Sequence, residues 1–136
     1  MSKLLVADDE DSIRMLVAEV AEPLGYTVER AANGAEAIKQ LETQAFDVLI
    51  TDINMGYGKT GFDVVTYASG LTPKPYIIMA SGTWSGEQRI KAAGLNVDEQ
   101  LDKPFAIHEL GKKLEELAKG CGSKPQEEKM TAPEYK

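Results

Sequence analysis

The sequence predicts an α/β fold in which five helices cover a doubly wound, five-stranded parallel sheet. Short apolar runs rich in branched side chains recur along the chain, and stretches with helical spacing separate them. These runs do not alternate polar with apolar residues, which is typical of strands buried on both faces. Crossovers between parallel strands are almost always right-handed, which limits the number of topologies that the chain can adopt.

Five strands are predicted from these runs. The clearest lie at 4–7, 47–51 and 76–80, where leucine, isoleucine and valine dominate. A weaker strand is predicted at 26–30 and a short one at 99–101.

The first helix is predicted from apolar residues that repeat at helical spacing between Ile13 and Leu24. Asp11 or Ser12 is available as its N-cap. Pro23 is expected to end or kink this helix in its last turn, because proline cannot donate a main-chain hydrogen bond.

The second helix opens at Asn33-Gly34-Ala35-Glu36, which resembles a capping box with asparagine in place of serine or threonine, and runs through Leu41. Apolar spacing predicts the remaining helices at 62–68, at 88–93 with Gly94 closing it, and at 107–117.

Composition limits the classes of partner and compartment. The chain has 136 residues and a net charge of −7, which suits one domain and argues against nucleic acid or an anionic membrane as partner. No run approaches the roughly 18 uncharged apolar residues of a membrane helix, and no cleavable signal pattern follows Met1. Cys121 is the single cysteine, so an internal disulfide is excluded and a reducing cytoplasm is expected.

The folded domain is predicted at 1–118, and the segment 119–136 is predicted to be a flexible tail. From Lys119 onward the helical spacing stops, and the remaining residues include four Lys and three Glu. The acidity therefore belongs to the folded part.

Chemistry-bearing residues follow four of the predicted strands: Asp8 and Asp9, Asp52, Ser81, and Lys103. The carboxyl ends of parallel strands meet at one edge of the sheet, where ligands bind. Three ionised carboxylates that meet there need a retained proton or a cation among them, and oxygen ligands suit Mg²⁺. The set suits phosphoryl transfer, in which Asp52 attacks phosphorus while Ser81 and Lys103 hold its oxygens.

The same residues resemble the receiver domain of two-component response regulators. The resemblance covers about 3–118 and is carried by four segments in family order: LLVADD (4–9), DVLITDINM (47–55), IIMASG (77–82) and LDKPF (101–105). It implies a flavodoxin-like sheet with strand order 2-1-3-4-5.

The resemblance also implies roles for individual residues. Asp52 would be the phosphoacceptor, and Asp9, Asp52 and the main-chain carbonyl of Asn54 would bind Mg²⁺ directly, with Asp8 acting through water. The phosphoryl group would come from a phosphohistidine of a sensor histidine kinase or a histidine phosphotransfer protein. An output protein would then receive the signal.

Gln100 and the loop 56–61 depart from the family pattern, and the role of Trp84 has two interpretations. Gln100 stands where receivers have an aromatic residue, so the usual aromatic gating is not expected. The glycine-rich loop 56–61 is longer than usual; it is either a flexible surface loop or a segment that brings Lys59 to the phosphate. Trp84, beside Ser81, either contacts a partner or packs against the domain itself.

The favoured function is a stand-alone receiver, because only 18 residues follow the predicted domain 1–118 and cannot form an output domain. An alternative is a receiver-fold binding module that acts without phosphorylation. An aspartyl phosphatase is disfavoured, because Asn54 stands where such enzymes have a second aspartate as acid and base. The chain is therefore expected to catalyse only its own phosphorylation and dephosphorylation.

Overall fold

The computed structural model describes residues 2–56, 58–104 and 106–121. Within these residues, strands and helices alternate. The strands are β1 (Ser2–Ala7), β2 (Tyr26–Ala31), β3 (Val48–Asp52), β4 (Tyr76–Ser81) and β5 (Glu99–Asp102). The helices are α1 (Asp11–Ala21), α2 (Gly34–Thr43), α3 (Gly61–Ser69), α4 (Gly86–Gly94) and α5 (Ile107–Glu116), with a 3₁₀ turn η1 (Glu22–Leu24) and a π-helical turn η2 (Leu117–Cys121).

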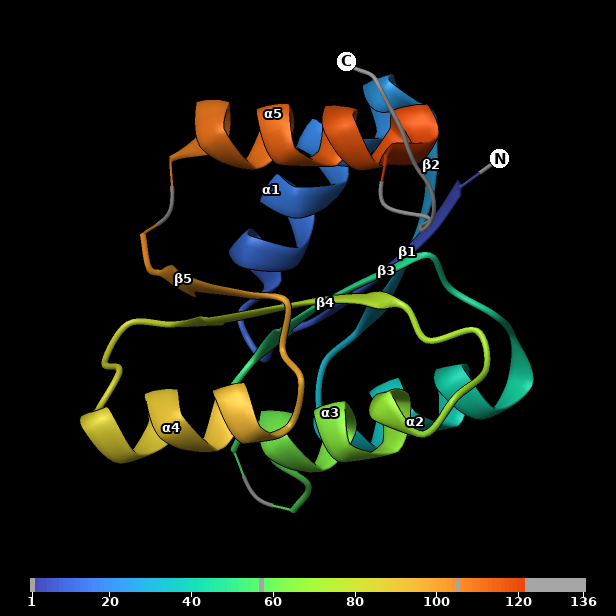
Figure 1. Ribbon diagram of the computed structural model, residues 1–136. Helices are drawn as coiled ribbons and strands as arrows, with labels where there is room; N and C mark the ends of the chain where they lie inside the picture. The colour runs from blue at the N-terminus through green and yellow to red at the C-terminus, as the bar shows by residue number, and fades with distance from the viewer. Residues whose placement is uncertain (1, 57, 105, 122–136) are drawn as a thin grey trace.

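All strand pairs are parallel, and their order in the sheet is β2-β1-β3-β4-β5. Helices α1 and α5 cover one face, and α2, α3 and α4 cover the other (Figure 1). The predicted doubly wound sheet is therefore confirmed, as is the strand order that the resemblance implied.

The core consists of two apolar layers, one on each face of the sheet. Leu5 and Leu49 pack in the layer beneath α2 and α3, whereas Leu4 packs with Val17 and Leu114 in the layer beneath α1 and α5. Neighbouring residues of β1 thus point to opposite faces and are both fully buried. This explains why the strands show no alternation in the sequence.

The start of α1 differs from the prediction. Glu10 occupies the N-cap position without a side-chain cap, and Asp11 is already helical, so neither Asp11 nor Ser12 is the N-cap. The turn before the helix is instead closed by Asp8, whose Oδ1 accepts a hydrogen bond from the Glu10 N–H at 2.9 Å. The helix ends at Ala21, before Pro23, as predicted.

Side-chain caps set the starts of three other helices. Asn33 caps α2 by accepting from the Glu36 N–H, as predicted, but the Glu36 side chain accepts from the Ala32 N–H at 2.8 Å, so the reciprocal bond of a capping box is made one residue earlier. Thr60 and Asp63 form a capping box at α3. A capping box of Ser85 and Gln88 starts α4 at Gly86, earlier than predicted.

The chain stays helical through Cys121, and most of the predicted tail, 122–136, lies outside the described residues. Among the helices that the structure describes, none is both long and apolar enough to traverse a bilayer.

Candidate functional site

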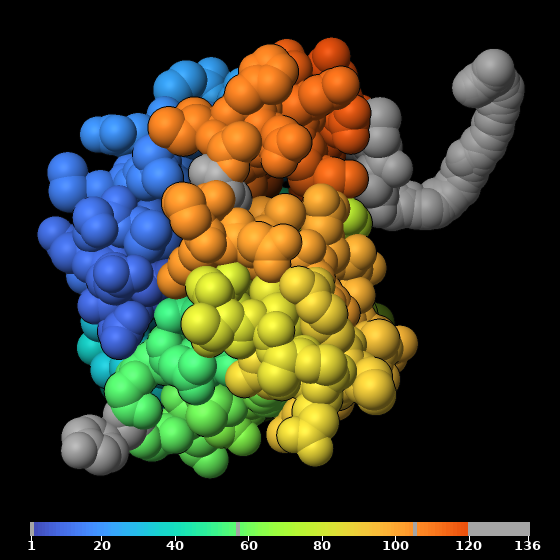
Figure 2. All heavy atoms as spheres, turned by 90° about the vertical axis from the view of Figure 1, so that its left-hand side faces the viewer, coloured from blue at the N-terminus to red at the C-terminus, as the bar shows by residue number. Residues whose placement is uncertain are grey.

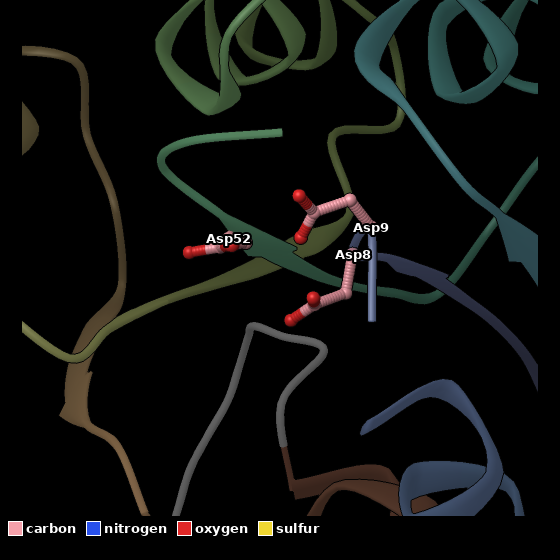
Figure 3. Close-up of side chains that lie close together, drawn as sticks. All are labelled: Asp8, Asp9 and Asp52. Carbon is pink, nitrogen blue, oxygen red and sulfur yellow. The ribbon is translucent and has the colours of Figure 1, made fainter. Parts of the chain in front are cut away.

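Three carboxylates meet at the carboxyl edge of the sheet. Strands β1 and β3 are neighbours in register from Leu4–Val48 to Ala7–Thr51, so the residues that follow them leave the sheet side by side. One oxygen from each of Asp8, Asp9 and Asp52 lies within 4.8 Å of the others (Figure 3). The structure therefore brings together the predicted acidic residues.

Asp8 is the buried member, with 2% of its surface exposed. Its Oδ1 accepts from the Glu10 N–H at 2.9 Å, and its Oδ2 accepts from Lys103 Nζ at 2.6 Å. Both oxygens are thus engaged, whereas Asp9 is exposed at the surface of the site.

Lys103 is the cation of the site. Its Nζ lies 2.6 Å from Asp8, 3.4 Å from Asp52 and 4.0 Å from Glu10. Burial alone would lower the pKa of Lys103, but its hydrogen bond to Asp8 and the charges of Asp52 and Asp8 outweigh burial, so the pKa is raised. The ammonium is therefore held in its charged form.

Asp52 sits at the end of β3, with 12% of its side chain exposed. Its Oδ1 accepts from the Ile53 N–H at 2.8 Å. Burial and, to a lesser degree, the charge of Asp8 raise the pKa of Asp52, and Lys103 only partly opposes them. Burial therefore disfavours the charged form of Asp52 more than Lys103 favours it.

Ser81 ends β4 beside this group. It is 3% exposed, and its Oγ accepts from the Thr83 N–H at 3.1 Å. Asp52, Asn54, Ser81 and Lys103 line one open hollow of about 420 Å³. Six of the predicted site residues thus occur together, with Asn54 and Asp9 exposed and the others at least partly buried.

Comparison with known proteins identifies this arrangement. The family described as the response regulator receiver domain matches residues 4–115. The chain belongs to the response regulator receiver family.

Relatives of this receiver domain cover nearly all of it. The chemotaxis protein CheY of Pseudomonas aeruginosa is 31% identical in an alignment of length 119 that covers 85% of this chain and 94% of that protein. A CheY-like receiver domain from Methanospirillum hungatei has a TM-score of 0.81 at 26% identity, covering 88% of this chain and 95% of the other. The response regulator TrrA of Thermotoga maritima, in complex with Mg²⁺ and BeF, has a TM-score of 0.73 at 32% identity, covering 86% and 99%.

The β3–α3 loop of this receiver domain is packed tightly at two glycines. A Cβ on Gly61 would lie only 1.9 Å from the main-chain oxygen of Asp52, and one on Gly34 would lie 2.4 Å from that of Lys59. The loop therefore runs from Asp52 past the start of α2. Its member Tyr57 lies outside the described residues.

Lys59 lines a separate hollow with Asn33 and Asp63 and is not among the residues that line the hollow at Asp52. The structure thus favours a surface-loop role for this segment over a phosphate-binding lysine. Gly61, next to the capping pair Thr60 and Asp63, is the sequence signal for this close approach, which the predictions from the sequence missed.

Trp84 packs against the domain itself. It is half-buried beside the apolar layer under α3, and its Nε1 donates to the main-chain oxygen of Leu101 at 2.7 Å. Gln100 on β5 is paired with Arg89 on α4: its Oε1 accepts from Arg89 Nη1 at 3.3 Å, and its Nε2 donates to the Arg89 carbonyl at 3.1 Å. Sequence reasoning did not identify Arg89, because the pairing depends on how α4 lies against β5.

Proposed function

We propose that this receiver domain is phosphorylated on Asp52 by a sensor histidine kinase or a histidine phosphotransfer protein, and that it signals through a separate output protein. One observation carries the proposal. The carboxylates of Asp8, Asp9 and Asp52 meet at one edge of the sheet, and the Lys103 ammonium contacts two of them, Asp8 and Asp52, beside an open hollow. Such an excess of negative charge is retained where a cationic ligand is to be bound.

The donor set fits Mg²⁺. Even without Glu10, three carboxylates and one ammonium give this group of side chains a net charge of about −2. Its potential ligand atoms are carboxylate oxygens, which Mg²⁺ prefers. Asp9, Asp52 and the Asn54 carbonyl would hold the ion directly. Asp8 would act through water, because its two oxygens already accept hydrogen bonds from Glu10 and Lys103. A bound Mg²⁺ supplies positive charge that neutralises phosphoryl oxygens.

The chain's own residues would carry out the transfer. An oxygen of Asp52 attacks phosphorus, the new O–P bond forms, and the N–P bond to the donor histidine breaks with its electron pair left on that nitrogen. Lys103, already 3.4 Å from Asp52, neutralises a phosphoryl oxygen, and the Ser81 hydroxyl donates to another. Burial of Ser81 and Asp8 keeps these groups oriented.

Intact-mass measurement after treatment with acetyl phosphate and Mg²⁺ tests this proposal. We expect one phosphoryl group per molecule, with no continued turnover of the donor beyond self-dephosphorylation. Asp52→Asn should abolish the addition, and Ser81→Ala should allow it while weakening the conformational response. Asp11→Asn is a matched control, since that carboxylate is 73% exposed and paired with Arg14.

Undiminished labelling of the Asp52→Asn protein would show that the acceptor lies elsewhere. A wild-type protein that binds Mg²⁺ but takes no phosphoryl group would favour the alternative, a receiver-fold module that acts by binding alone. The proposal includes a cytoplasmic location, which the single cysteine suits, and no direct partnership with nucleic acid or membrane.

A further inference from the structure

A group of contacts joins the loop after β4 to the edge strand β5 and to α4, on the face shown in Figure 2. The indole N–H of Trp84 donates to Leu101 O at 2.7 Å, and the Arg89 guanidinium lies 5.2 Å from the centroid of the indole ring. Arg89 also pairs with Asp102 at 3.1 Å and exchanges two hydrogen bonds with Gln100. We refer to Trp84, Arg89, Gln100, Leu101 and Asp102 as the Trp84 latch.

The latch is connected to Ser81 of the proposed phosphorylation site through Thr83. The Ser81 Oγ accepts from the Thr83 N–H at 3.1 Å, and Thr83 directly precedes Trp84. A hydroxyl can donate and accept at the same time, so Ser81 can donate to a phosphoryl oxygen while it keeps this bond. A movement of Ser81 toward phosphate would then carry Thr83 with it.

We propose that the Trp84 latch is the conformational switch of this receiver domain. This inference rests on phosphorylation at Asp52. Movement of Ser81 and Thr83 toward the phosphoryl group draws Trp84 away from Leu101 and breaks the indole hydrogen bond. Arg89 then loses the ring beneath it, and the links between α4 and β5 loosen.

Gln100 explains why the switch takes this form. Its amide donates to Arg89 and accepts from it, which an aromatic ring at this position could not do. The aromatic side chain beside β5 is supplied instead by Trp84, from the loop that follows Ser81. The polar residue on β5 therefore holds the latch closed, and the aromatic residue moves.

The latch contacts are weak enough for a single phosphorylation to shift the equilibrium between the closed and the open latch. Arg89 is 46% exposed and Asp102 is 78% exposed, so their ion pair is screened by water. A ligand shifts a two-state equilibrium only through its different affinity for the two states, and Ser81 provides that difference here.

Trp84 is the only tryptophan of the chain, so its fluorescence reports the latch directly. Acrylamide quenching and intact mass are measured on the same sample before and after acetyl phosphate with Mg²⁺. Phosphorylated wild-type protein should show increased quenching and a red-shifted emission maximum. Arg89→Gln should move the unphosphorylated protein toward the same values.

Lys91→Gln is the matched control. Lys91 lies on the same helix and its Nζ is 4.6 Å from the centroid of the Phe62 ring, so this change also removes a cation above an aromatic ring but leaves the latch intact. Quenching of the unphosphorylated Lys91→Gln protein should equal that of the wild type.

Affinity for the phosphoryl mimic beryllofluoride with Mg²⁺ separates coupling from simple loss of structure. Because coupling is reciprocal, a loosened latch should tighten this binding, by roughly threefold for Arg89→Gln. Lys91→Gln should leave it unchanged. Equal affinities for the two variants, or a phosphorylated wild type with unaltered Trp84 quenching, would overturn the latch while leaving Asp52 as the acceptor. A wild type that takes no phosphoryl group would overturn both proposals.

Discussion

Replacing Asp52 by asparagine should stabilise this protein when divalent ions are absent. The substitution removes one negative charge from a site that holds three carboxylates and one ammonium. The amide oxygen of asparagine can still accept the hydrogen bond that the Ile53 N–H donates at 2.8 Å. The change therefore alters the charge of the site with little change in its shape.

The expected gain follows from the charges around Asp52 and from its burial. A like charge up to 4.8 Å away repels it by about 3.5 kcal/mol or more at an effective dielectric constant of about 20, and Lys103 at 3.4 Å attracts it by about 4.9 kcal/mol, so these two effects largely offset each other. Burial is the largest cause of the raised pKa of Asp52, and the neutral amide avoids part of a desolvation penalty of about 1–3 kcal/mol that the carboxylate carries. We expect stabilisation by about 1–2 kcal/mol, or roughly 3–8 °C in melting temperature.

Thermal unfolding in the presence of EDTA, followed by circular dichroism, measures this gain. Saturating Mg²⁺ should reverse the order of stability, because the wild-type site binds the ion more tightly and binding to the folded state stabilises it. Asp11→Asn, which removes an exposed carboxylate, should change stability by less than about 0.5 kcal/mol. An Asp52→Asn protein that melts below the wild type in EDTA would refute the reasoning.

The gain should also depend on pH in a defined direction. In the unfolded chain Asp52 ionises near its ordinary pKa of 3.8, and in the folded protein its pKa is higher. Between the two values the folded wild type binds more protons than the unfolded chain, so its stability falls as pH rises. The advantage of Asp52→Asn should therefore be complete above the folded-state pKa and should shrink as pH falls toward 3.8.

Three further changes test other parts of the structure. Gly61→Ala would place a Cβ 1.9 Å from the Asp52 main-chain oxygen, so it should cost on the order of 3 kcal/mol in thermal unfolding. Gly82→Ala, whose Cβ would meet no described atom within 4 Å, should cost almost nothing, and equal costs would contradict the packing. Burial and the neighbouring carboxylate of Asp47 raise the pKa of Tyr26 to about 12. In an ultraviolet absorbance titration, Tyr26→Phe should therefore lack the tyrosine ionisation that the wild type shows near pH 12. Since the unfolded chain loses that proton near pH 10, the wild type should lose stability from about pH 10 to 12 and the variant should lack that part of the loss. Lys103→Met should lower the melting temperature in EDTA and increase the stabilisation by Mg²⁺, because a buried carboxylate loses its partner at 2.6 Å.

Local sequence determined much of the fold. The three apolar runs at 4–7, 47–51 and 76–80 became the inner strands β1, β3 and β4, because a strand buried on both faces needs uninterrupted apolar side chains. Helix starts were harder to predict, since a cap competes with other uses of the same side chain. Asp11 has a side chain that commonly caps helices, but the hydrogen bond from the Glu10 N–H to Asp8 closes the turn before α1 and places Glu10 at the N-cap position.

The candidate site could be predicted because its residues follow strands whose ends the topology brings to one edge. Ser81 and Lys103, far apart in sequence, are joined there by a hydrogen bond from the Lys103 N–H to Ser81 O at 2.9 Å. Contacts between α4 and β5 could not be predicted in this way. Arg89 and Gln100 meet through side-chain conformations and the packing of a helix, neither of which leaves a motif in the sequence.

The two groups that would hold a phosphoryl oxygen are anchored very differently, and this decides which of them can move. Lys103 is fixed at both ends, by its main-chain bond to Ser81 and by the 2.6 Å contact of its Nζ with Asp8, itself held by Glu10. Among the residues that the structure describes, the side chain of Ser81 is bonded only to Thr83, in an exposed loop. A phosphoryl group that attracts both would therefore displace the loop that carries Trp84 and leave β5 in place, which makes the relative movement of Trp84 and Leu101 the expected response.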